Sequence, residues 1–293
     1  MPASLTGVIA IDKPAGVSSR RVVDAVAKAL GTKVVGHAGT LDPLAEGVVV
    51  VCVGPATKLV DYLHELPKRY RAEFLLGRSS PSDDLETPVE VEPAAVRPTA
   101  EAVAAALPAF RGAILQRPCD YSAVHVAGQR AYRLARQGRP LDLAAKPVRI
   151  DHLEVTHYEW PRLGLDIACS SGTFVRALGR DLAAALGTRA VMEALVREAV
   201  GPFSRGAALP LAAVGPKSIR AALMPAVAAV PHLPRLALDA AMLDLAVRGG
   251  LVDLGSGSAD AVAACDEAGE LVGILKRHPS GRHRLRPNFR GAG

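Results

Sequence analysis

The chain has 293 residues, of which 49% are hydrophobic and 22% are charged. This length suits one large domain with a small second one. The apolar runs are too short to cross a membrane, and residues 1–7 lack the basic and apolar regions of a secretory signal. The four cysteines are scattered and form no CxxC pair, which argues against disulfides and a zinc site. The composition therefore predicts a cytoplasmic protein with reduced thiols.

The positive charge is concentrated at the C-terminal end. Residues 276–293 carry six basic side chains and no acidic one, which equals the net charge of +6 for the whole chain. The rest of the chain is therefore balanced. A basic end of this kind is either a solvated, solubilising tail or a surface that contacts phosphates. Charge alone does not decide between these two interpretations.

The predicted elements mix strands with a few helices. An apolar run over residues 7–12 predicts a strand, and Ser18 or Ser19 then caps a helix that ends before Gly31. The next elements are strands over 48–53 and 70–76, a helix over 100–107 capped by Thr99, strands over 148–157 and 163–169, and a helix capped by Ser171 or Thr173 that ends before Gly187. The elements do not follow regular βαβ alternation, so the pattern predicts an α+β fold.

A domain boundary is predicted within the Pro-, Ala- and Val-rich stretch 225–234. Beyond it, two apolar runs over 261–265 and 270–276 flank the turn signal Asp266-Glu267-Ala268-Gly269. Such an arrangement is typical of a β-hairpin. The C-terminal end should therefore form a small β-rich module.

Familiar cofactor and catalytic motifs are absent from the sequence. It contains no GxGxxG after a strand, no GxxxxGK[ST], no HExxH and no nucleophile elbow. The segment 36–47 stands out instead, because two glycines bracket His37 and Pro43 directly follows Asp42. A proline holds the residue before it in an extended conformation, so Asp42 should lie in a loop at the rim of the strand that follows. Asp-Pro is also a common turn, and the local pattern leaves both interpretations open.

Several blocks in a fixed order resemble the bacterial tRNA pseudouridine synthase B (TruB) family, whose relatives include dyskerin. The blocks are Lys13-Pro14-Ala15-Gly16-Val17-Ser18-Ser19, Gly36-His37-Ala38-Gly39-Thr40-Leu41-Asp42-Pro43, Lys68-Arg69-Tyr70, Tyr121-Ser122-Ala123, Gly128-Gln129-Arg130-Ala131-Tyr132, Ser171-Gly172-Thr173-Phe174-Val175-Arg176 and Leu195-Val196-Arg197. One such block is weak evidence, but their common order over most of the chain is strong evidence.

The resemblance implies a fold and a domain organisation. Residues 1–228 would form a mixed-sheet pseudouridine synthase domain, within which 111–143 is an insertion that grips the T arm of tRNA. Residues 229–293 would form a small PUA-like RNA-binding domain. The implied reaction is the isomerisation of uridine 55 in the T loop to pseudouridine, without a cofactor or a metal.

The resemblance also implies a catalytic pair. It assigns catalysis to Asp42, which must be ionised near neutral pH. Burial of a carboxylate raises its pKa, so a fixed cation has to lie close to it. Arg176 matches the family arginine, and its guanidinium could hold the carboxylate bidentately.

Four further residues match the family pocket. Tyr70 would stack on a flipped-out base, Leu195 would form an apolar wall, and His37 would contact the RNA as a neutral imidazole. Phe174 departs from the pattern, because the family usually has tyrosine at this position. Apolar packing of Phe174 against the base could survive the loss of the hydroxyl.

The implied partners are the T arm and acceptor stem of tRNA, bound by a monomer without an obligatory protein partner. A non-catalytic tRNA-binding chaperone on the same scaffold is an alternative, although Asp42 and Arg176 are both present. A guide-RNA-dependent relative of dyskerin is disfavoured, because the chain keeps the tRNA-recognising insertion and lacks a long lysine-rich tail.

Overall fold

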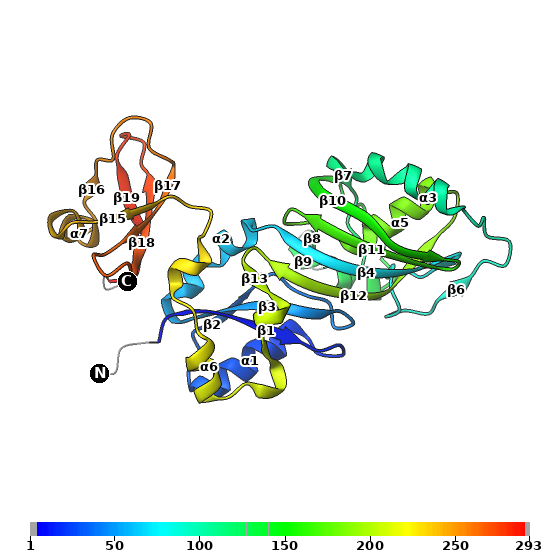
Figure 1. The fold of residues 1–293 in the computed structure, drawn as a ribbon, viewed down its shortest axis with the longest axis horizontal. Coiled ribbons are helices and arrows are strands. Elements are labelled where there is room, and N and C mark those ends of the chain that lie inside the picture. The colour runs from blue at the N-terminus through cyan, green and yellow to red at the C-terminus, as the bar shows by residue number, and fades with distance from the viewer. Residues whose placement is uncertain (1–4, 123, 127, 140, 291–293) are drawn as a thin grey trace.

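The computed structural model of the protein describes residues 5–122, 124–126, 128–139 and 141–290. Ala123 of the Tyr-Ser-Ala block lies outside the described residues. Figure 1 shows a large sheet with helices and, at one end of the molecule, a smaller sheet formed by the C-terminal part of the chain. The α+β class expected from the sequence is confirmed.

The large sheet is mixed and has the order β14-β1-β3-β12-β4-β11-β10-β7, with β13 paired to β12 and β2 paired to β3. Its strands are β1 (Gly7–Lys13), β2 (Val35–Ala38), β3 (Glu46–Val53), β4 (Lys68–Leu76), β7 (Gly112–Gln116), β10 (Lys146–Glu159), β11 (Arg162–Cys169), β12 (Ala190–Val200), β13 (Phe203–Ser204) and β14 (Leu209–Pro210). The pairs β1–β14 and β3–β12 are parallel, and the other pairs are antiparallel.

Two small hairpins and seven α-helices are the other elements described here among the residues that the structure covers. The hairpin strands are β5 (Arg78–Ser79), β6 (Glu90–Val91), β8 (His125–Val126) and β9 (Gln129–Arg130). The α-helices among the described residues are α1 (Ser19–Leu30), α2 (Val60–Glu65), α3 (Ala100–Ala106), α4 (Ala131–Arg136), α5 (Val175–Ala185), α6 (Pro216–Ala222) and α7 (Ala240–Val247). Helix α7 belongs to the C-terminal module, and the others precede it.

Helix α1 begins and ends where the sequence predicts. The Ser18 side chain accepts a hydrogen bond from the Arg21 amide, and Gly31 adopts φ 65° after the last turn. Both are the usual ways of satisfying backbone groups at helix ends. Val22 and Val26 of this helix are fully buried in the main core.

Helix α5 begins later than predicted, so the expectation that Ser171 or Thr173 caps it is wrong. Phe174 occupies the N-cap position without a side-chain cap, while the Thr173 hydroxyl donates to the Ser170 carbonyl at 3.1 Å. The buried Gln116 side chain holds Phe174 instead. Its amide oxygen accepts from the Phe174 N–H at 2.8 Å, and its amide nitrogen donates to the Phe174 carbonyl at 3.1 Å. A residue 58 positions away therefore fixes the backbone just before the helix.

Strand β3 is buried on both faces, which accounts for its continuous apolar sequence. Val49 and Val51 belong to the core that contains α1 and α5, whereas Val48 and Val50 belong to a second core. The loop that precedes β3 carries Asp42, so this carboxylate lies directly before a rigid element.

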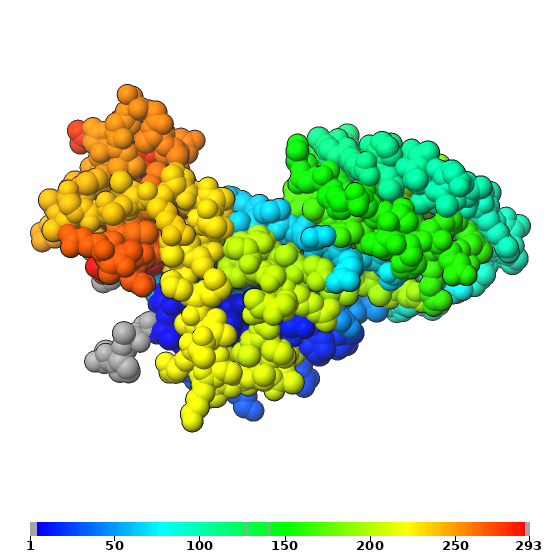
Figure 2. All heavy atoms as spheres, in the orientation of Figure 1, coloured from blue at the N-terminus to red at the C-terminus, as the bar shows by residue number. Residues whose placement is uncertain are grey.

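The C-terminal module has a five-stranded sheet with the order β15-β17-β18-β19-β16. Its strands are β15 (Arg235–Ala237), β16 (Leu251–Val252), β17 (Ala261–Cys265), β18 (Leu271–Arg277) and β19 (His283–Asn288). The predicted hairpin is confirmed, because β17 and β18 pair antiparallel around a turn with Gly269 at φ 78°. Figure 2 shows this module, coloured orange to red, at one end of the molecule.

The basic C-terminal segment is part of the folded module, and whether its charges are only solvated or contact phosphates stays a prediction. Most of it forms the end of β18 and the whole of β19, and the inward side chains His283 and Leu285 are buried. Alternation along β19 places Arg284 and Arg286 on the opposite face, and the exposed Arg282 directly precedes the strand.

All four cysteines are buried free thiols, as expected. No helix of the described residues is both long and apolar enough to cross a membrane.

Candidate active site

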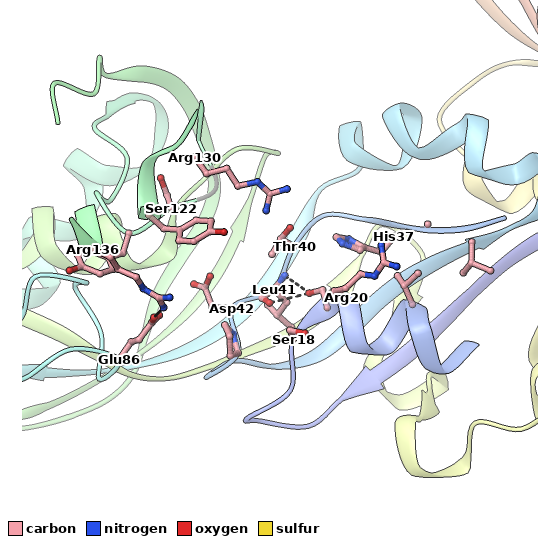
Figure 3. Close-up of a pocket in the computed structure, with 17 residues that line it drawn as sticks. Ser18, Arg20, His37, Thr40, Leu41, Asp42, Glu86, Ser122, Arg130 and Arg136 are labelled. Atoms are coloured by element: carbon pink, nitrogen blue, oxygen red, sulfur yellow. Dashed lines mark hydrogen bonds and ion pairs between the residues drawn. The ribbon is translucent and has the colours of Figure 1, made fainter. Parts of the chain in front are cut away.

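Two cavities meet at the loop that carries Asp42. The smaller one has a volume of about 130 Å³ and the larger one about 600 Å³. Both are lined by Thr40, Leu41, Asp42 and Ser122. Figure 3 shows the larger cavity, with Asp42 between the side chains of Ser122, Arg130 and Arg136 on one side and those of Arg20 and His37 on the other. The Asp42 carboxylate therefore lies at the junction of a small and a wide space.

Buried polar side chains hold this loop by its backbone. The Ser19 hydroxyl accepts from the Leu41 amide at 2.8 Å and donates to the Leu41 carbonyl at 3.0 Å. The Lys13 ammonium, which has no exposed surface, donates to the Pro43 carbonyl at 3.3 Å and to the Ala45 carbonyl at 2.5 Å. Burial and then the nearby positive charge of Arg197 lower the pKa of Lys13 to about 8. The backbone on both sides of Asp42 is thus fixed by groups that do not contact its carboxylate.

Arg176 is the cation beside Asp42, as the sequence predicts. Its Nη2 atom lies 3.1 Å from Asp42 Oδ2, while its Nη1 atom lies 3.2 Å from Asp84 Oδ2. The guanidinium also donates to the Ser82 carbonyl at 2.7 Å and to the Tyr121 carbonyl at 2.8 Å. The expected bidentate pairing with Asp42 is therefore not what the structure shows. Arg176 bridges two carboxylates instead, and four acceptors fix its orientation.

Burial raises the pKa of Asp42 above its usual value, and Arg176 opposes this rise. Asp84 and Glu86 raise the pKa further by like-charge repulsion, and Lys13 adds a smaller opposing effect. Without Arg176 the carboxylate would be protonated more readily still. The pair thus provides the charge compensation that an ionised catalytic carboxylate requires.

The small cavity brings together the residues expected to bind the base. Tyr70 on β4, Leu195 on β12 and Phe174 before α5 line it together with Asp42 and Arg176. Tyr70 is 8% exposed and Leu195 is 6% exposed. Typical ligand pockets measure about 300–1,000 Å³, so a space of about 130 Å³ accepts a single ring rather than a whole nucleotide.

His37 lies on β2 and lines the larger cavity, not the smaller one. Burial, followed by the charge of Arg197, lowers the pKa of His37, so the imidazole is neutral at pH 7. Its Nδ1 atom is buried without a hydrogen-bond partner among the described residues. The large cavity further contains the cations Arg20, Arg130 and Arg136.

An acidic loop over residues 82–86 pairs with three arginines near the cavities. Asp83 pairs with Arg180 at 3.2 Å, Asp84 pairs with Arg176, and Glu86 pairs with Arg136 of α4. Each carboxylate of the loop thus has an arginine partner. Within the described residues, no three His, Cys, Asp or Glu side chains are placed to hold a metal ion.

Comparison with known proteins shows the family to which the chain belongs. Residues 27–175 match the family model described as TruB family pseudouridylate synthase (N terminal domain). A protein named tRNA pseudouridine synthase B from Gluconacetobacter diazotrophicus is 40% identical over 256 residues, covering 85% of this chain and 83% of its own length. The chain belongs to the TruB family of pseudouridylate synthases. It is therefore an isomerase.

Other members and solved structures support the TruB assignment. The tRNA pseudouridine synthase B of Nitrobacter winogradskyi is 42% identical over 250 residues, covering 81% of this chain and 70% of its own length. A chain in the crystal structure of a Cbf5–Nop10–Gar1 complex superposes with a TM-score of 0.74. That chain is 23% identical, and the match covers 97% of this chain and 85% of that one. At this identity the likeness shows the fold, which includes the C-terminal module.

Several residues of this TruB site were not predicted from the sequence. Asp84 and Glu86 lie in a polar stretch whose pattern gives no sign of a contact with Arg176 or Arg136. Gln116 lies on an edge strand, and its contact with Phe174 depends on the sheet. Only their proximity in the fold reveals these roles.

Proposed function

We propose that this TruB family member isomerises uridine 55 in the T loop of tRNA, with Asp42 as the catalytic carboxylate. The relatives cited above are named tRNA pseudouridine synthases, which supports tRNA as the substrate. The observation that carries the assignment of Asp42 is its position. Its carboxylate lies 3.1 Å from Arg176, where a ring-sized cavity opens into a wider one.

The reaction rearranges one nucleotide without a net change in composition. The N1–C1′ bond breaks, the uracil rotates, and a C5–C1′ bond forms, after which C5 loses its proton and N1, which carried none in uridine, gains one. Asp42 could attack C1′, attack the base or remove a sugar proton, and each of these roles requires the ionised carboxylate. Arg176 favours that form by its charge.

The target uridine has to leave the stacked T loop to reach Asp42. Tyr70, Phe174 and Leu195 offer an apolar and aromatic surface in the small cavity that replaces the lost stacking. Stacking of a base on an aromatic side chain is worth about 1–3 kcal/mol. His37, a neutral imidazole with a free Nδ1 atom, supports the flipped-out arrangement from the larger cavity.

The remaining RNA is held by two basic regions. The insertion at residues 111–143 contributes Arg130 and Arg136 to the larger cavity, which supports contact with the T arm. The arginine face of β19 supports contact with the acceptor stem, because clustered cations bind phosphates. We further propose that the protein acts as a monomer in the cytoplasm, where buried free thiols such as these remain reduced.

Replacement of Asp42 by asparagine tests this function. The Asp42→Asn variant should form no pseudouridine and should bind tRNA within several-fold of the wild type, because the shape of the site is kept while the charge is lost. The assay is the release of tritium from the C5 position of uridine in an unmodified tRNA transcript, without a guide RNA. Asp151→Asn, an exposed change on β10, is the matched control and should be fully active.

The outcomes separate the candidate functions. Substantial product from Asp42→Asn would remove Asp42 from catalysis. Binding of tRNA by the wild type without any product would favour the chaperone. Product that appears only after a guide RNA is added would favour the guide-dependent class, and product at a uridine outside the T loop would overturn the position.

A further inference from the structure

Arg197 is a buried cation without an acidic partner. Only 2% of its surface is exposed, and no carboxylate among the described residues forms an ion pair with it. The guanidinium instead donates to three backbone carbonyls, those of Val48 at 2.7 Å, Gly39 at 3.1 Å and Thr40 at 3.4 Å. Arginine cannot shed its proton when it is buried, so this charge is permanent. Such a group is costly to bury, and an apolar side chain could fill the same space.

The three carbonyls belong to the two ends of the Asp42 loop. Gly39 and Thr40 precede Asp42, and Val48 follows it on β3. One guanidinium therefore joins the two ends of the loop. The backbone of Arg197 also closely approaches the end of the loop at Gly47, where a Cβ atom would lie 2.2 Å from the Arg197 carbonyl oxygen.

The strand that carries Arg197 also carries part of the base-binding cavity. Leu195 lies two residues earlier on β12, so its side chain is on the same face as that of Arg197. Across the antiparallel pair β4–β12, Arg197 is opposite Tyr70. Arg197 thus connects the loop that bears Asp42 to the two strands that bear Tyr70 and Leu195.

The other anchors of the loop act at different points. Ser19 binds the backbone of Leu41, and Lys13 binds the carbonyls of Pro43 and Ala45. Neither contacts Gly39 or Thr40, which set the direction in which the chain enters the loop. Arg197 is therefore the anchor that determines where Asp42 stands relative to the cavity walls.

We propose that Arg197 is a positioning residue for the isomerisation, which holds the Asp42 loop in register with the walls of the base-binding cavity. This inference rests on the proposed catalytic role of Asp42. A misplacement of reacting groups by about 1 Å can cost on the order of 100-fold in rate. Loss of Arg197 should therefore lower turnover far more than it lowers tRNA affinity.

The test compares Arg197→Met and Arg197→Lys under single-turnover conditions on an unmodified tRNA transcript. Arg197→Met should lose about 100-fold in rate per folded molecule and keep its Kd for tRNA within about threefold. Arg197→Lys keeps the charge but cannot reach all three carbonyls, so its rate should be intermediate. Hydrogen exchange should become faster in peptides covering residues 38–47 and stay unchanged in those covering β10.

A core variant separates positioning from a general loss of stability. Leu153→Ala removes a fully buried side chain of β10 that lines neither cavity, so it should lower the melting temperature and keep the rate per folded molecule. An equal loss of rate in Leu153→Ala would overturn the proposal, as would a rate of Arg197→Met within about threefold of the wild type.

Two results keep the test decisive. If Arg197→Met does not fold, the Arg197→Lys variant carries the test, and wild-type rate and exchange in that variant overturn the proposal. The Asp42→Asn variant is measured in parallel. An active Asp42→Asn refutes the catalytic role of Asp42 on which this inference rests, whereas an inactive Asp42→Asn beside a fully active Arg197→Met refutes the positioning role alone.

Discussion

At the residue scale, the protonation state of Asp42 depends on a balance between burial and two cations. Burial is the largest influence and raises the pKa of Asp42, while Arg176 and, more weakly, Lys13 lower it. The net result is a pKa of Asp42 above its usual value. The ionised form that the proposed catalytic role requires is therefore lost at a higher pH than for an exposed aspartate.

This balance predicts an acid limb in the rate of pseudouridine formation. As the pH falls through the raised pKa of Asp42, the carboxylate becomes protonated and the single-turnover rate should decrease. The limb should lie above about pH 4, the usual pKa of aspartate. Rates at saturating enzyme over a series of buffers measure it. The variant His37→Gln should keep the limb, because the limb is expected to report the Asp42 carboxylate and the proposed mechanism gives His37 no acid–base role. A limb that disappears in His37→Gln would assign it to the histidine instead.

Phe174 is the departure from the family pattern, and its environment predicts that tyrosine is tolerated there. The backbone of Phe174, not its ring, is what Gln116 binds at the start of α5. Phe174 is half-buried and lines the small cavity, so we expect this wall to accommodate an added hydroxyl. Phe174→Tyr should form pseudouridine within several-fold of the wild-type rate. Complete inactivity in a folded variant would show that the small cavity does not receive the base.

At the element scale, β19 places arginines of the basic C-terminal stretch on one face of the module. Its inward residues His283 and Leu285 are buried, whereas Arg286 is exposed and Arg284 is half-buried on the other face. Two neighbouring cations are already paired, since Arg277 contacts Asp260 at 2.6 Å and Arg290 contacts Asp266. Arg282, Arg284 and Arg286, in contrast, form no ion pair with a carboxylate of the described residues.

Replacement of Arg282, Arg284 and Arg286 by alanine should flatten the salt dependence of tRNA binding. Each arginine that contacts a phosphate contributes about one unit to the slope of log K against log salt concentration. The triple variant should lose up to about three units and bind more weakly, with an unchanged rate at saturation. Binding titrations at several salt concentrations measure the slope, with Arg248→Ala on α7 as the control. An unchanged slope in the triple variant would separate β19 from the RNA.

Point substitutions are needed here, because a deletion of residues 276–293 would remove a strand from the interior of the five-stranded sheet.

The ends of two helices show which boundaries the sequence predicts. Helix α1 was predicted correctly because its signals, a serine cap and a following glycine, are local. The start of α5 was not, because its backbone is bound by Gln116, a distant residue.

At the scale of the whole molecule, the C-terminal module is packed against the catalytic domain through a shared apolar core. Ile274 of β18 belongs to the same cluster as Tyr62, Leu66 and Val8 of the catalytic domain. The Lys276 ammonium lies 5.1 Å from the centre of the Tyr62 ring, and His232 lies 3.1 Å from Glu65. These contacts predict that the two parts unfold together.

A pair of neighbouring substitutions tests this coupling. Ile274→Ala and Leu275→Ala each remove a fully buried side chain, at a cost of about 2–5 kcal/mol in the free energy of unfolding. Ile274 faces the catalytic domain, whereas Leu275 belongs to the core of the module itself. The wild type should melt in one transition by calorimetry, and both variants should also melt in one transition, at a lower temperature. A separate early transition in Leu275→Ala alone would show that the module unfolds independently.

The sequence by itself determined the α+β class, the seven strands β1, β3, β4, β10, β11, β17 and β18, the boundaries of α1, the hairpin of the C-terminal module and the proximity of Arg176 to Asp42. These depend on local periodicity, on caps and turns, and on motif blocks that can be read along the chain. The tertiary structure decided that Arg176 also holds Asp84, that Gln116 fixes Phe174, that Arg197 joins the two ends of the Asp42 loop and that the basic end is a strand. Each of these contacts joins residues far apart in the chain, and only the closure of the sheets brings such residues together.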